Sequence, residues 1–507
     1  MTRMEPVCAT RLGRVRGRFS STPSTTSPSG PPNPETPDAV AVASFLGIPY
    51  ATAPRFGPPV PVEPWEGIRP AVSYGPTAPK AAYAPPLDAL VPENFIAGKP
   101  GESCLNLNVW TPSPGPEARL PVMVWVHGGA FSNGSGSASA YDGGAFARDG
   151  VVCVTLNYRL GVEGFLHLDG VPDNRGLLDQ IAALEWVRDN IAFFGGDPDR
   201  VTVFGESAGA MSIGVLLGLA KARGLFRRAI LQSGAAHHFL RPASARLITA
   251  RLAEKLSVAP TADGFAAVPD ARLLSAQTEL RAEIGARPDP ALWGEAALNM
   301  MPFEPVLEER IPPASDRGVE LLVGSNREEY RLFLVPTGRL DALREPKLRA
   351  TAAAYGLDPG PALSVYREAR PRATPGELLD AMSTDWFYRI PAIRLAEAVP
   401  GSYLYEFAWR SPCFDGGLGA CHASELGFVF DRLHDPSYAP MLGDRPPQEV
   451  ADAMHRAWVA FAETGDPGWE AYDTEKRTAM VFGGAGAASE TAQDLRPRER
   501  ELWEGLR

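Results

Sequence analysis

The sequence VTVFGESAGA, residues 201–210, places a serine between two glycines directly after a run of β-branched and aromatic residues. A G-x-S-x-G sequence between a strand and a helix forms a tight turn whose small flanking residues leave the serine hydroxyl exposed above a sheet. The five residues alone do not exclude an ordinary loop serine. Their flanks favour the tight turn, because RVTVFG (200–205) is typical of a strand and SAGAMSIGVLLGLA (207–220) of a helix.

The same alternation of apolar strands and helices extends on both sides of this turn. Helical spacing of apolar residues, followed by a Gly pair, predicts a helix in residues 174–196. Apolar strands that alternate with helices indicate an α/β fold. We therefore predict a large, mostly parallel central sheet with helices on both faces and a site at the carboxyl ends of its strands. Short apolar runs indicate these strands within residues 121–131, 150–161, 227–234 and 320–330.

The chain contains no Pro- and Gly-rich linker and no repeat of fixed period inside this pattern. We therefore expect residues 1–507 to form a single domain, although its length alone would allow more. Residues 19–38, FSSTPSTTSPSGPPNPETPD, are rich in Ser, Thr and Pro and contain hardly any apolar side chains. Because such a segment buries too little surface to offset its loss of entropy, we predict a mobile loop there.

Composition and charge restrict the classes of function. The 507 residues are 45% hydrophobic and 21% charged, which is typical of a soluble globular chain. The net charge of −11 argues against nucleic-acid or anionic membrane partners, which select clustered cations. The N-terminal sequence has no apolar core of a secretory signal, and no stretch is long enough to span a membrane, so we predict a cytoplasmic protein. Five cysteines without a CxxC pair suggest neither a disulfide framework nor a zinc site.

A serine hydroxyl needs a base to act as a nucleophile, and histidine is the usual one. Where this serine turn occurs, the chain order is nucleophile, acid, histidine, which excludes His127 and His167. His422 is favoured because it follows loop glycines and precedes an apolar stretch in GLGACHASELGFVF (417–430). The alternatives that stay open are His237 and His238, and, as surface or helix residues, His434 and His455.

A second motif, HGGAF at residues 127–131, follows a predicted strand about 80 residues before Ser207. Glycines at this place let backbone amides turn toward a ligand, as an oxyanion hole requires. The alternative is a simple glycine turn. The position of the motif relative to the serine favours an anion-binding loop.

Taken in order along nearly the whole chain, these motifs resemble the type-B carboxylesterases, the family that includes bacterial para-nitrobenzyl esterases and the cholinesterases. The resemblance implies an α/β-hydrolase fold. It also implies a serine carboxylesterase that acts on small-molecule esters through an acyl-enzyme and needs no cofactor or metal. Besides the two motifs above, it is carried by FLGIPYA (45–51), RFGPP (55–59), CLNLNVWTP (104–112), GACHASELGFVF and WVAFAETGDP (458–467).

The resemblance also implies roles for single residues. Ser207 matches the nucleophile, His422 the general base and then general acid, and Glu329 the acid that orients the imidazole. Glu328 is the alternative acid, and it otherwise corresponds to a solvated charge. Because relatives usually carry glycine where this chain has Tyr330, we expect a different local backbone after the acid. The oxyanion donors implied are the backbone amides of Gly129, Ala130 and Ala208.

Supporting residues follow from the same resemblance. Glu425 and Ser233 match positions that support the histidine through hydrogen bonds in relatives. No tryptophan lies between Trp65 and Trp110, so specificity for choline esters is not indicated. The structural ion pairs implied are Arg55 with Glu102 and Arg159 with Asp179.

Two other functions fit the same residues. Amide or carbamate hydrolysis would use the same triad on a poorer leaving group, and a non-catalytic binding module would use the same fold without chemistry. Residues 80–100, 285–302 and 330–345 are expected to shape the substrate pocket. Aromatic candidates for its lining, each also compatible with the core, are Phe131, Phe333, Trp386 and Phe428.

Overall fold

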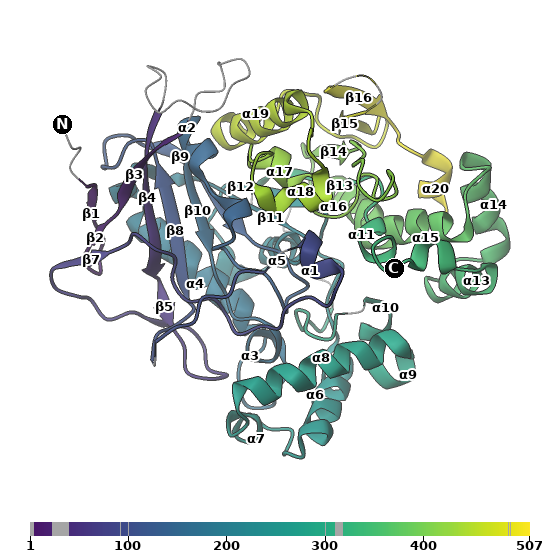
Figure 1. The fold of residues 1–507 in the computed structure, drawn as a ribbon, viewed down its shortest axis with the longest axis horizontal. Helices are drawn as coiled ribbons and strands as arrows, with labels where there is room; N and C mark the ends of the chain where they lie inside the picture. The colour runs from purple at the N-terminus through teal and green to yellow at the C-terminus, as the bar shows by residue number, and fades with distance from the viewer. Residues whose placement is uncertain are drawn as a thin grey trace.

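The computed structural model describes residues 5–22, 40–91, 93–99, 101–299, 301–309, 318–484, 486 and 488–506. Within these residues the fold is built on an eleven-stranded sheet (Figure 1). Its strands, in spatial order, are β16 (Ser489–Gln493), β15 (Thr478–Phe482), β14 (Tyr403–Phe407), β13 (Glu320–Asn326), β12 (Arg228–Gln232), β11 (Gly196–Glu206), β9 (Leu120–Val126), β10 (Val152–Leu156), β8 (Asn106–Thr111), β4 (Val40–Pro49) and β3 (Arg18–Thr22).

The middle of this sheet is parallel and its edges are antiparallel. In the run of strands from β10 through β9, β11, β12, β13 and β14 to β15, each strand runs parallel to the next. The outer strands β16, β8, β4 and β3 pair in antiparallel register. This arrangement confirms the predicted large, mostly parallel sheet. Two small sheets lie apart from it and contain β1 (Val7–Ala9), β2 (Arg14–Arg16) and β7 (Ile68–Pro70), and β5 (Ala51–Thr52) and β6 (Val60–Pro61).

Helices cover both faces of the sheet. Successive strand residues point to opposite faces, so that Val122 and Val124 of β9 pack in one core and Met123 and Trp125 in the other. Helices α4, α5 and α16 supply the first core, and α2, α17 and α19 supply the second. These helices are α2 (Gly144–Arg148), α4 (Arg175–Asn190), α5 (Ala208–Leu216), α16 (Ile390–Ala398), α17 (Leu426–Val429) and α19 (Gln448–Thr464).

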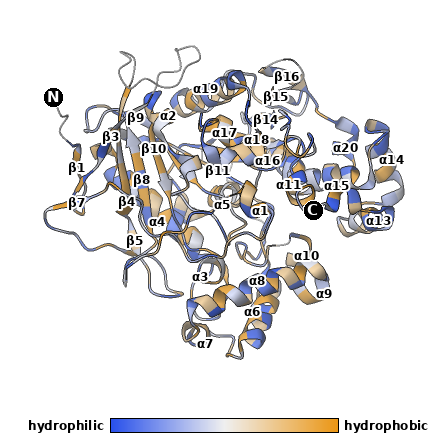
Figure 2. Ribbon diagram, viewed as in Figure 1, coloured by the Kyte–Doolittle hydropathy of each residue, from blue (hydrophilic) through white to orange (hydrophobic). Residues whose placement is uncertain are grey.

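Two further groups of helices project from the sheet, one teal and one green in Figure 1. They arise in the connections from β12 to β13 and from β13 to β14. Helices such as α6 and α8 alternate hydrophobic and hydrophilic residues along their length (Figure 2), as expected where only one side is buried. The teal group is α6 (Pro242–Leu256), α7 (Ala262–Ala266), α8 (Asp270–Ala286), α9 (Pro290–Trp293) and α10 (Ala296–Asn299). The green group is α11 (Arg331–Leu334), α12 (Arg339–Ala342), α13 (Glu345–Ala354), α14 (Pro359–Ala369) and α15 (Pro375–Thr384).

The remaining helices are short: α1 (Leu87–Leu90), α3 (Gly161–Phe165), α18 (Ala439–Leu442) and α20 (Pro497–Glu501). In the described part of the chain, no helix has both the length and the apolar character that crossing a membrane requires.

The prediction of a mobile loop at residues 19–38 is wrong at its start. Residues 19–22 belong to β3, which pairs with β4 so that Phe19 lies opposite Ala43. The antiparallel ladder with β4 holds these residues at the edge of the sheet, and Phe19 also packs against the core. Residues 23–38 of the predicted loop lie outside the described residues.

Candidate active site

Ser207 lies on a sharp bend between β11 and α5. Its backbone has φ 54° and ψ −123°, a combination that costs energy for a residue with a side chain. The bend is fixed on both sides, because the Ser207 amide donates to the carbonyl of Gln232 at 2.9 Å and its carbonyl accepts from Met211 at 2.8 Å. The strand–turn–helix context expected from the sequence is therefore present, and it holds the serine in a strained conformation.

Glycines around Ser207 let this bend pack closely against the end of β9. A Cβ atom at Gly205 would lie 2.6 Å from the carbonyl oxygen of Val126, and one at Gly209 would overlap that same oxygen. Any larger residue at either position would push the bend away from the sheet. The two glycines of the motif thus serve a close backbone approach.

His422 is joined to Glu329 twice. Its Nδ1 lies 2.7 Å from Oε2 of Glu329, and its backbone amide donates to the Glu329 carbonyl at 3.1 Å. The other oxygen of this fully buried carboxylate accepts from the Asn326 amide at 2.7 Å. The side chain that the resemblance assigns as the acid is therefore fixed by the backbone of β13, and it directs Nε2 of the imidazole away from itself.

The Nε2 atom of His422 lies 3.0 Å from Oε1 of Glu206, the residue directly before Ser207. Among the described residues, no hydrogen bond joins His422 to the Ser207 hydroxyl, although both side chains line the same pocket. Burial lowers the pKa of His422, but the contacts with Glu206 and Glu329 outweigh it and raise the pKa well above its usual value. The two carboxylates on either side of the imidazole thus favour its protonated form.

A third buried carboxyl group, that of Glu425, lies next to this pair. It accepts hydrogen bonds from Gln232 Nε2 at 3.0 Å and from Asn326 Nδ2 at 2.7 Å. Burial, with the charges of Glu206 and Glu329, raises the pKa of Glu425 to about 8. The resemblance implied a hydrogen bond from Glu425 to the histidine, but the oxygens of Glu425 bond to Gln232 and Asn326 instead. Glu425 is thus linked to Glu329 through Asn326, whose backbone amide donates to Glu329.

Ser233, the other expected support, does not hydrogen-bond to the histidine either. Its hydroxyl is fully buried and has no hydrogen-bond partner among the described residues.

The HGGAF segment forms a loop beside Ser207. Gly129 has φ 113° and Ala130 has φ 52°, and the Gly129 carbonyl accepts hydrogen bonds from the amides of Ser132 and Asn133 at 3.1 and 2.8 Å. Within the described residues, no acceptor is bonded to the amides of Gly129 and Ala130, which line the same pocket as Ser207. Ala208 opens α5, where backbone amides have no partner within the helix. The amides of Gly129 and Ala130 thus face the pocket without an acceptor, whereas Ala208 is buried and is not among the residues that line the pocket.

His127, at the start of this loop, is a structural residue. Its ring stacks on Tyr158 at a centroid distance of 4.4 Å, and its Nδ1 lies 2.8 Å from the Gly128 carbonyl. The Tyr158 hydroxyl donates to the His127 carbonyl at 2.8 Å. Burial lowers the pKa of His127 to about 3, so the ring is neutral and supports the loop.

Ser207, His422 and the glycine loop open into a pocket of about 630 Å³. Residues from the predicted pocket segments 80–100 and 330–345 line it, whereas among the described residues none from 285–302 does. In place of that segment, Arg281 of α8 forms part of the wall.

Of the four aromatic candidates, only Phe333 lines the pocket, where its ring lies 5.6 Å from that of His422. For the other three residues the alternative of core packing holds, because these side chains are buried in the interior. Phe131 contacts Phe165, Trp386 stacks on Tyr355, and Phe428 packs against Phe407 and Trp409.

Glu328, the alternative acid, points away from the histidine. Its Oε2 accepts from the Ala420 amide at 3.0 Å, and its Oε1 pairs with Arg331 at 3.1 Å and with Arg410. It is therefore a paired charge rather than a solvated one. Tyr330, which replaces the usual glycine, has an ordinary helical φ of −74°, so no glycine is required there.

The alternative histidines on the C-terminal side lie elsewhere. His455 is buried on α19, where its Nδ1 lies 2.7 Å from the Val429 carbonyl and its Nε2 3.0 Å from Asp149. His434 is exposed. Neither lines the pocket of Ser207.

One of the two expected ion pairs is present. The guanidinium of Arg159 binds both oxygens of the buried Asp179, at 2.7 and 2.8 Å. The pairing of Arg55 with Glu102 is wrong. Arg55 instead lies 3.1 Å from Glu163 and 3.0 Å from Asp270, because it packs against the start of α8, whereas Glu102 bonds to the Lys99 amide within its own turn.

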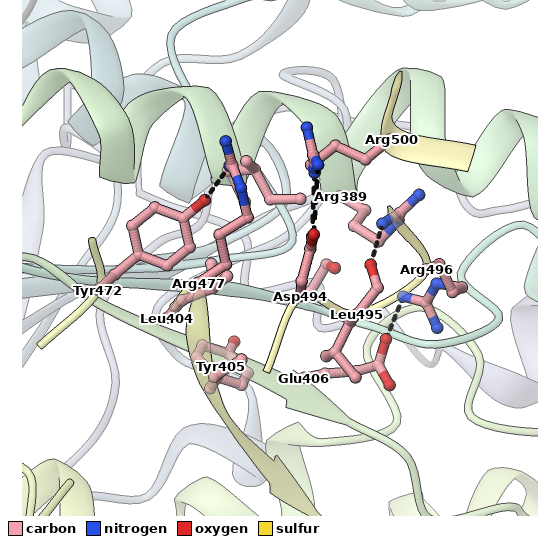
Figure 3. A pocket seen from close by; sticks show the side chains of 14 residues that line it. Arg389, Leu404, Tyr405, Glu406, Tyr472, Arg477, Asp494, Leu495, Arg496 and Arg500 are labelled. Carbon is pink, nitrogen blue, oxygen red and sulfur yellow. Dashed lines mark hydrogen bonds and ion pairs between the residues drawn. The ribbon is translucent and has the colours of Figure 1, made fainter. Parts of the chain in front are cut away.

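A second hollow lies between α16 and the strands β14 and β15 (Figure 3). Its volume of about 20 Å³ holds roughly one water molecule. Its arginines are already bonded within the protein: Arg500 to Asp494 at 3.1 Å, Arg389 to the Leu495 carbonyl at 2.9 Å, and Arg496 to Glu406. This cluster joins the C-terminal segment to the sheet and contains no group of the site around Ser207.

Sequence reasoning missed three polar residues of the site, Glu206, Gln232 and Asn326. Each is the last residue of a parallel strand, β11, β12 or β13, and each is buried. The sequence did contain a signal for these residues, since each is a polar residue at the end of an apolar strand. The ends of neighbouring parallel strands meet at one edge of the sheet, where sites of this fold class lie.

The fold and this site define an α/β-hydrolase with a serine on a strand-to-helix bend. The sequence model described as "Carboxylesterase family" matches residues 4–499, so the chain belongs to that family and is a carboxylic ester hydrolase. It is similar to the para-nitrobenzyl esterase of Bacillus subtilis (strain 168), with 38% identity over 87% of this chain and 91% of the relative. Liver carboxylesterase 1 of Oryctolagus cuniculus is 32% identical over 99% of this chain and 93% of its own length.

The structural comparison agrees. Carboxylesterase EST55 of Geobacillus stearothermophilus superposes with a TM-score of 0.79 at 36% identity, covering 98% of this chain and 99% of that chain. The α/β-hydrolase fold and the family predicted from the sequence are confirmed.

Proposed function

We propose that Ser207, His422 and Glu329 form a catalytic triad that hydrolyses small-molecule carboxylic esters through an acyl-enzyme. The observation that carries this proposal is the meeting of a strained serine and a carboxylate-bound histidine at one pocket. A nucleophile, a base and a group that orients the base are the parts that such chemistry requires.

In the first step, His422 removes the proton of Ser207 as the serine oxygen attacks the ester carbonyl. Nε2 must first lose its proton and turn from Glu206 toward the serine hydroxyl. Catalytic hydrogen bonds are often long in unliganded enzymes and tighten when substrate binds, so the resting geometry is compatible with this step. Glu329 keeps the other ring nitrogen protonated and stabilises the imidazolium that forms.

The backbone amides of Gly129, Ala130 and Ala208 are proposed to stabilise the oxyanion. They gather at the start of α5 and in the glycine loop, and the positive end of the helix dipole also favours negative charge there. His422 then protonates the leaving alcohol, and water repeats the cycle on the acyl-enzyme. These steps use protein groups and water, and the absence of a cofactor stays a prediction.

Hydrolysis of a series of para-nitrophenyl esters tests the proposal. The variant Ser207→Ala should lower kcat by at least about 10⁴-fold, because the nucleophile and its triad act as a unit. The control is Ser275→Ala, which removes the hydroxyl of an exposed serine on α8 and should retain the wild-type rate. A Ser207→Ala variant with wild-type turnover would refute the assignment.

Matched ester and amide substrates distinguish the esterase from an amide or carbamate hydrolase with the same triad. The proposal expects faster turnover of the ester, because alkoxide is the better leaving group. A folded protein that turns over none of these substrates and leaves Ser207 unmodified by an organophosphonate would instead be a binding module.

Two further expectations also stay predictions. We infer that residues 1–507 fold as a single domain, which a single calorimetric unfolding transition would support. We also infer a cytoplasmic location, which fractionation of the producing cells would test.

A further inference from the structure

Arg281 lies on α8 and forms part of the wall of the Ser207 pocket. Its side chain is half-buried, and it faces a pocket that also contains Tyr83, Glu93 and Glu206. A cation in this position can contact a molecule bound in the pocket.

The guanidinium of Arg281 makes one hydrogen bond to the described protein, from Nη1 to the Asn133 side-chain oxygen at 3.1 Å. An arginine side chain carries five N–H donors, and no carboxylate of the described residues lies within ion-pair distance of Arg281. The buried arginines elsewhere differ. Arg159 binds both oxygens of Asp179, and Arg175, which has no carboxylate partner, is bonded to four backbone carbonyls.

The other charged groups of the wall already have partners. Glu93 lies 3.4 Å from Lys80, which is not itself a lining residue and also donates to the Gly134 carbonyl at 3.0 Å. Glu93 also accepts from the Gly134 amide at 2.9 Å. Glu206 is paired with His422. Arg281 is therefore the one charged side chain of the described pocket lining that has no oppositely charged group within ion-pair distance.

The surroundings of Arg281 are suited to an anion. Burial lowers the pKa of Arg281, which reflects the cost of holding its charge away from water, and only the Tyr83 phenol opposes this effect. Burial raises the pKa of Tyr83, so its hydroxyl stays protonated and is available as a second donor. A carboxylate between these two side chains would receive charge-assisted hydrogen bonds.

Arg281 is also close to the reacting centre along the chain of contacts. It bonds to Asn133, whose backbone amide donates to the carbonyl of Gly129 in the glycine loop. Arg281 and Ser207 also line the same pocket, so one bound molecule can reach both.

We propose that Arg281 binds a carboxylate of the substrate, so that the preferred esters carry a negative charge in addition to the ester group. This inference rests on the proposed function of the Ser207 pocket. It names a substrate class, the carboxylate-bearing esters, and a residue that selects it.

The test compares two pairs of esters whose members differ only in carboxylate against amide. Ethyl hydrogen glutarate and ethyl 4-carbamoylbutanoate place the difference on the acyl side, and 4-acetoxybenzoate and 4-acetoxybenzamide place it on the alcohol side. The wild type should give a higher kcat/KM for the carboxylate member of at least one pair. The carboxylate preference is the kcat/KM of the carboxylate ester divided by that of its amide partner. Arg281→Met should lower this ratio by about 10- to 100-fold, mainly through KM of the carboxylate ester, because a hydrogen-bonded charge contact is lost.

Two variants control this result. Arg281→Lys keeps the charge but not the planar fork, so it should retain part of the preference. Arg272→Met removes a charge from an exposed position on the same helix, where Arg272 bonds to the Leu256 carbonyl, and it should keep the wild-type ratio. A ratio that Arg281→Met leaves unchanged in both pairs overturns the proposal. If Arg281→Met lowers kcat/KM equally for the carboxylate and the amide ester, the proposal is also overturned, because Arg281 would then act only by supporting Asn133.

Calorimetry with the Ser207→Ala variant separates this inference from the proposed function. Ethyl hydrogen glutarate should bind more tightly than ethyl 4-carbamoylbutanoate, and the difference should disappear when Arg281→Met is added. If Arg281-dependent, tighter binding of ethyl hydrogen glutarate is found but the wild type hydrolyses neither ester, the proposed hydrolytic function is refuted and the carboxylate site is retained.

Discussion

Glu206 and His422 are in contact, with Oε1 of the carboxylate 3.0 Å from Nε2 of the imidazole. Glu329 holds the opposite ring nitrogen at 2.7 Å, so the imidazole lies between two carboxylates. One of these carboxylates belongs to the residue that directly precedes Ser207. The arrangement favours the protonated histidine and therefore sets the pH at which a base becomes available.

The first prediction concerns the pH dependence of kcat/KM. The proposed step needs neutral His422, and the raised pKa of this residue keeps it protonated below that value. Activity should therefore rise with pH through an ionisation above the usual histidine value of about 6.5. In Glu206→Gln one of the charges that raise the pKa is gone, so the rising limb should move to lower pH.

The control for this shift is Glu185→Gln, which removes an exposed charge on α4. Its profile should match the wild type between pH 5 and 9. A flat wild-type profile, or a limb that Glu206→Gln leaves in place, would contradict the role of His422 as the base.

The second prediction distinguishes the two neighbouring glutamates. Glu329→Gln should lower kcat by about 10²- to 10⁴-fold, because a neutral partner no longer stabilises the imidazolium. Glu328→Gln should stay close to the wild-type rate, since Glu328 bonds to Ala420, Arg331 and Arg410 rather than to His422. The reverse order in steady-state rates would make Glu328 the acid.

The third prediction tests the glycine loop. A Cβ atom at Gly129 would overlap the carbonyl oxygen of Asn133, and the φ of 113° disfavours any side chain. Gly129→Ala should therefore displace an oxyanion donor and lower kcat by about 10²- to 10³-fold. Gly115→Ala is the matched control, because Gly115 has a similar φ of 124° with open space around its Cβ. Equal kcat in the two variants would contradict the assignment.

The fourth prediction concerns stability. Asp179→Asn should lower the free energy of unfolding by about 3 to 5 kcal/mol, because it leaves the buried Arg159 charge without its partner. Asp189→Asn breaks the partly exposed pair with Arg188 and should change it by less than about 1 kcal/mol. Denaturant unfolding of both variants compares the two values, and similar losses would contradict the structural role of Asp179.

The fold could be predicted from sequence because its signals are local. The strand β11, the serine bend and α5 occupy adjacent residues, and each has a pattern that needs no distant contact. The candidate triad was harder to predict, since spacing alone left several histidines open. The resemblance to a family selected His422 and Glu329, and the structure then brought these two residues together.

The pocket lining and the ion pairs were harder to predict, because they depend on contacts between segments that are distant in the sequence. The aromatic residues Phe131 and Trp386 have the same hydrophobic signal whether they line a pocket or fill a core, and both are in the core. Arg55 meets Glu163 and Asp270 only because α3 and α8 pack together. Arg281 belongs to an unremarkable helix, and only the fold places it in the pocket wall.

The central claim is that Ser207 is the nucleophile activated by His422. Its most direct test is labelling of the folded protein with a fluorophosphonate, followed by mass spectrometry of the peptide that contains residues 201–210. The account predicts one covalent adduct on Ser207, formed much more slowly in His422→Ala. A folded protein in which Ser207 stays unmodified, or in which His422→Ala reacts as fast as the wild type, would contradict it.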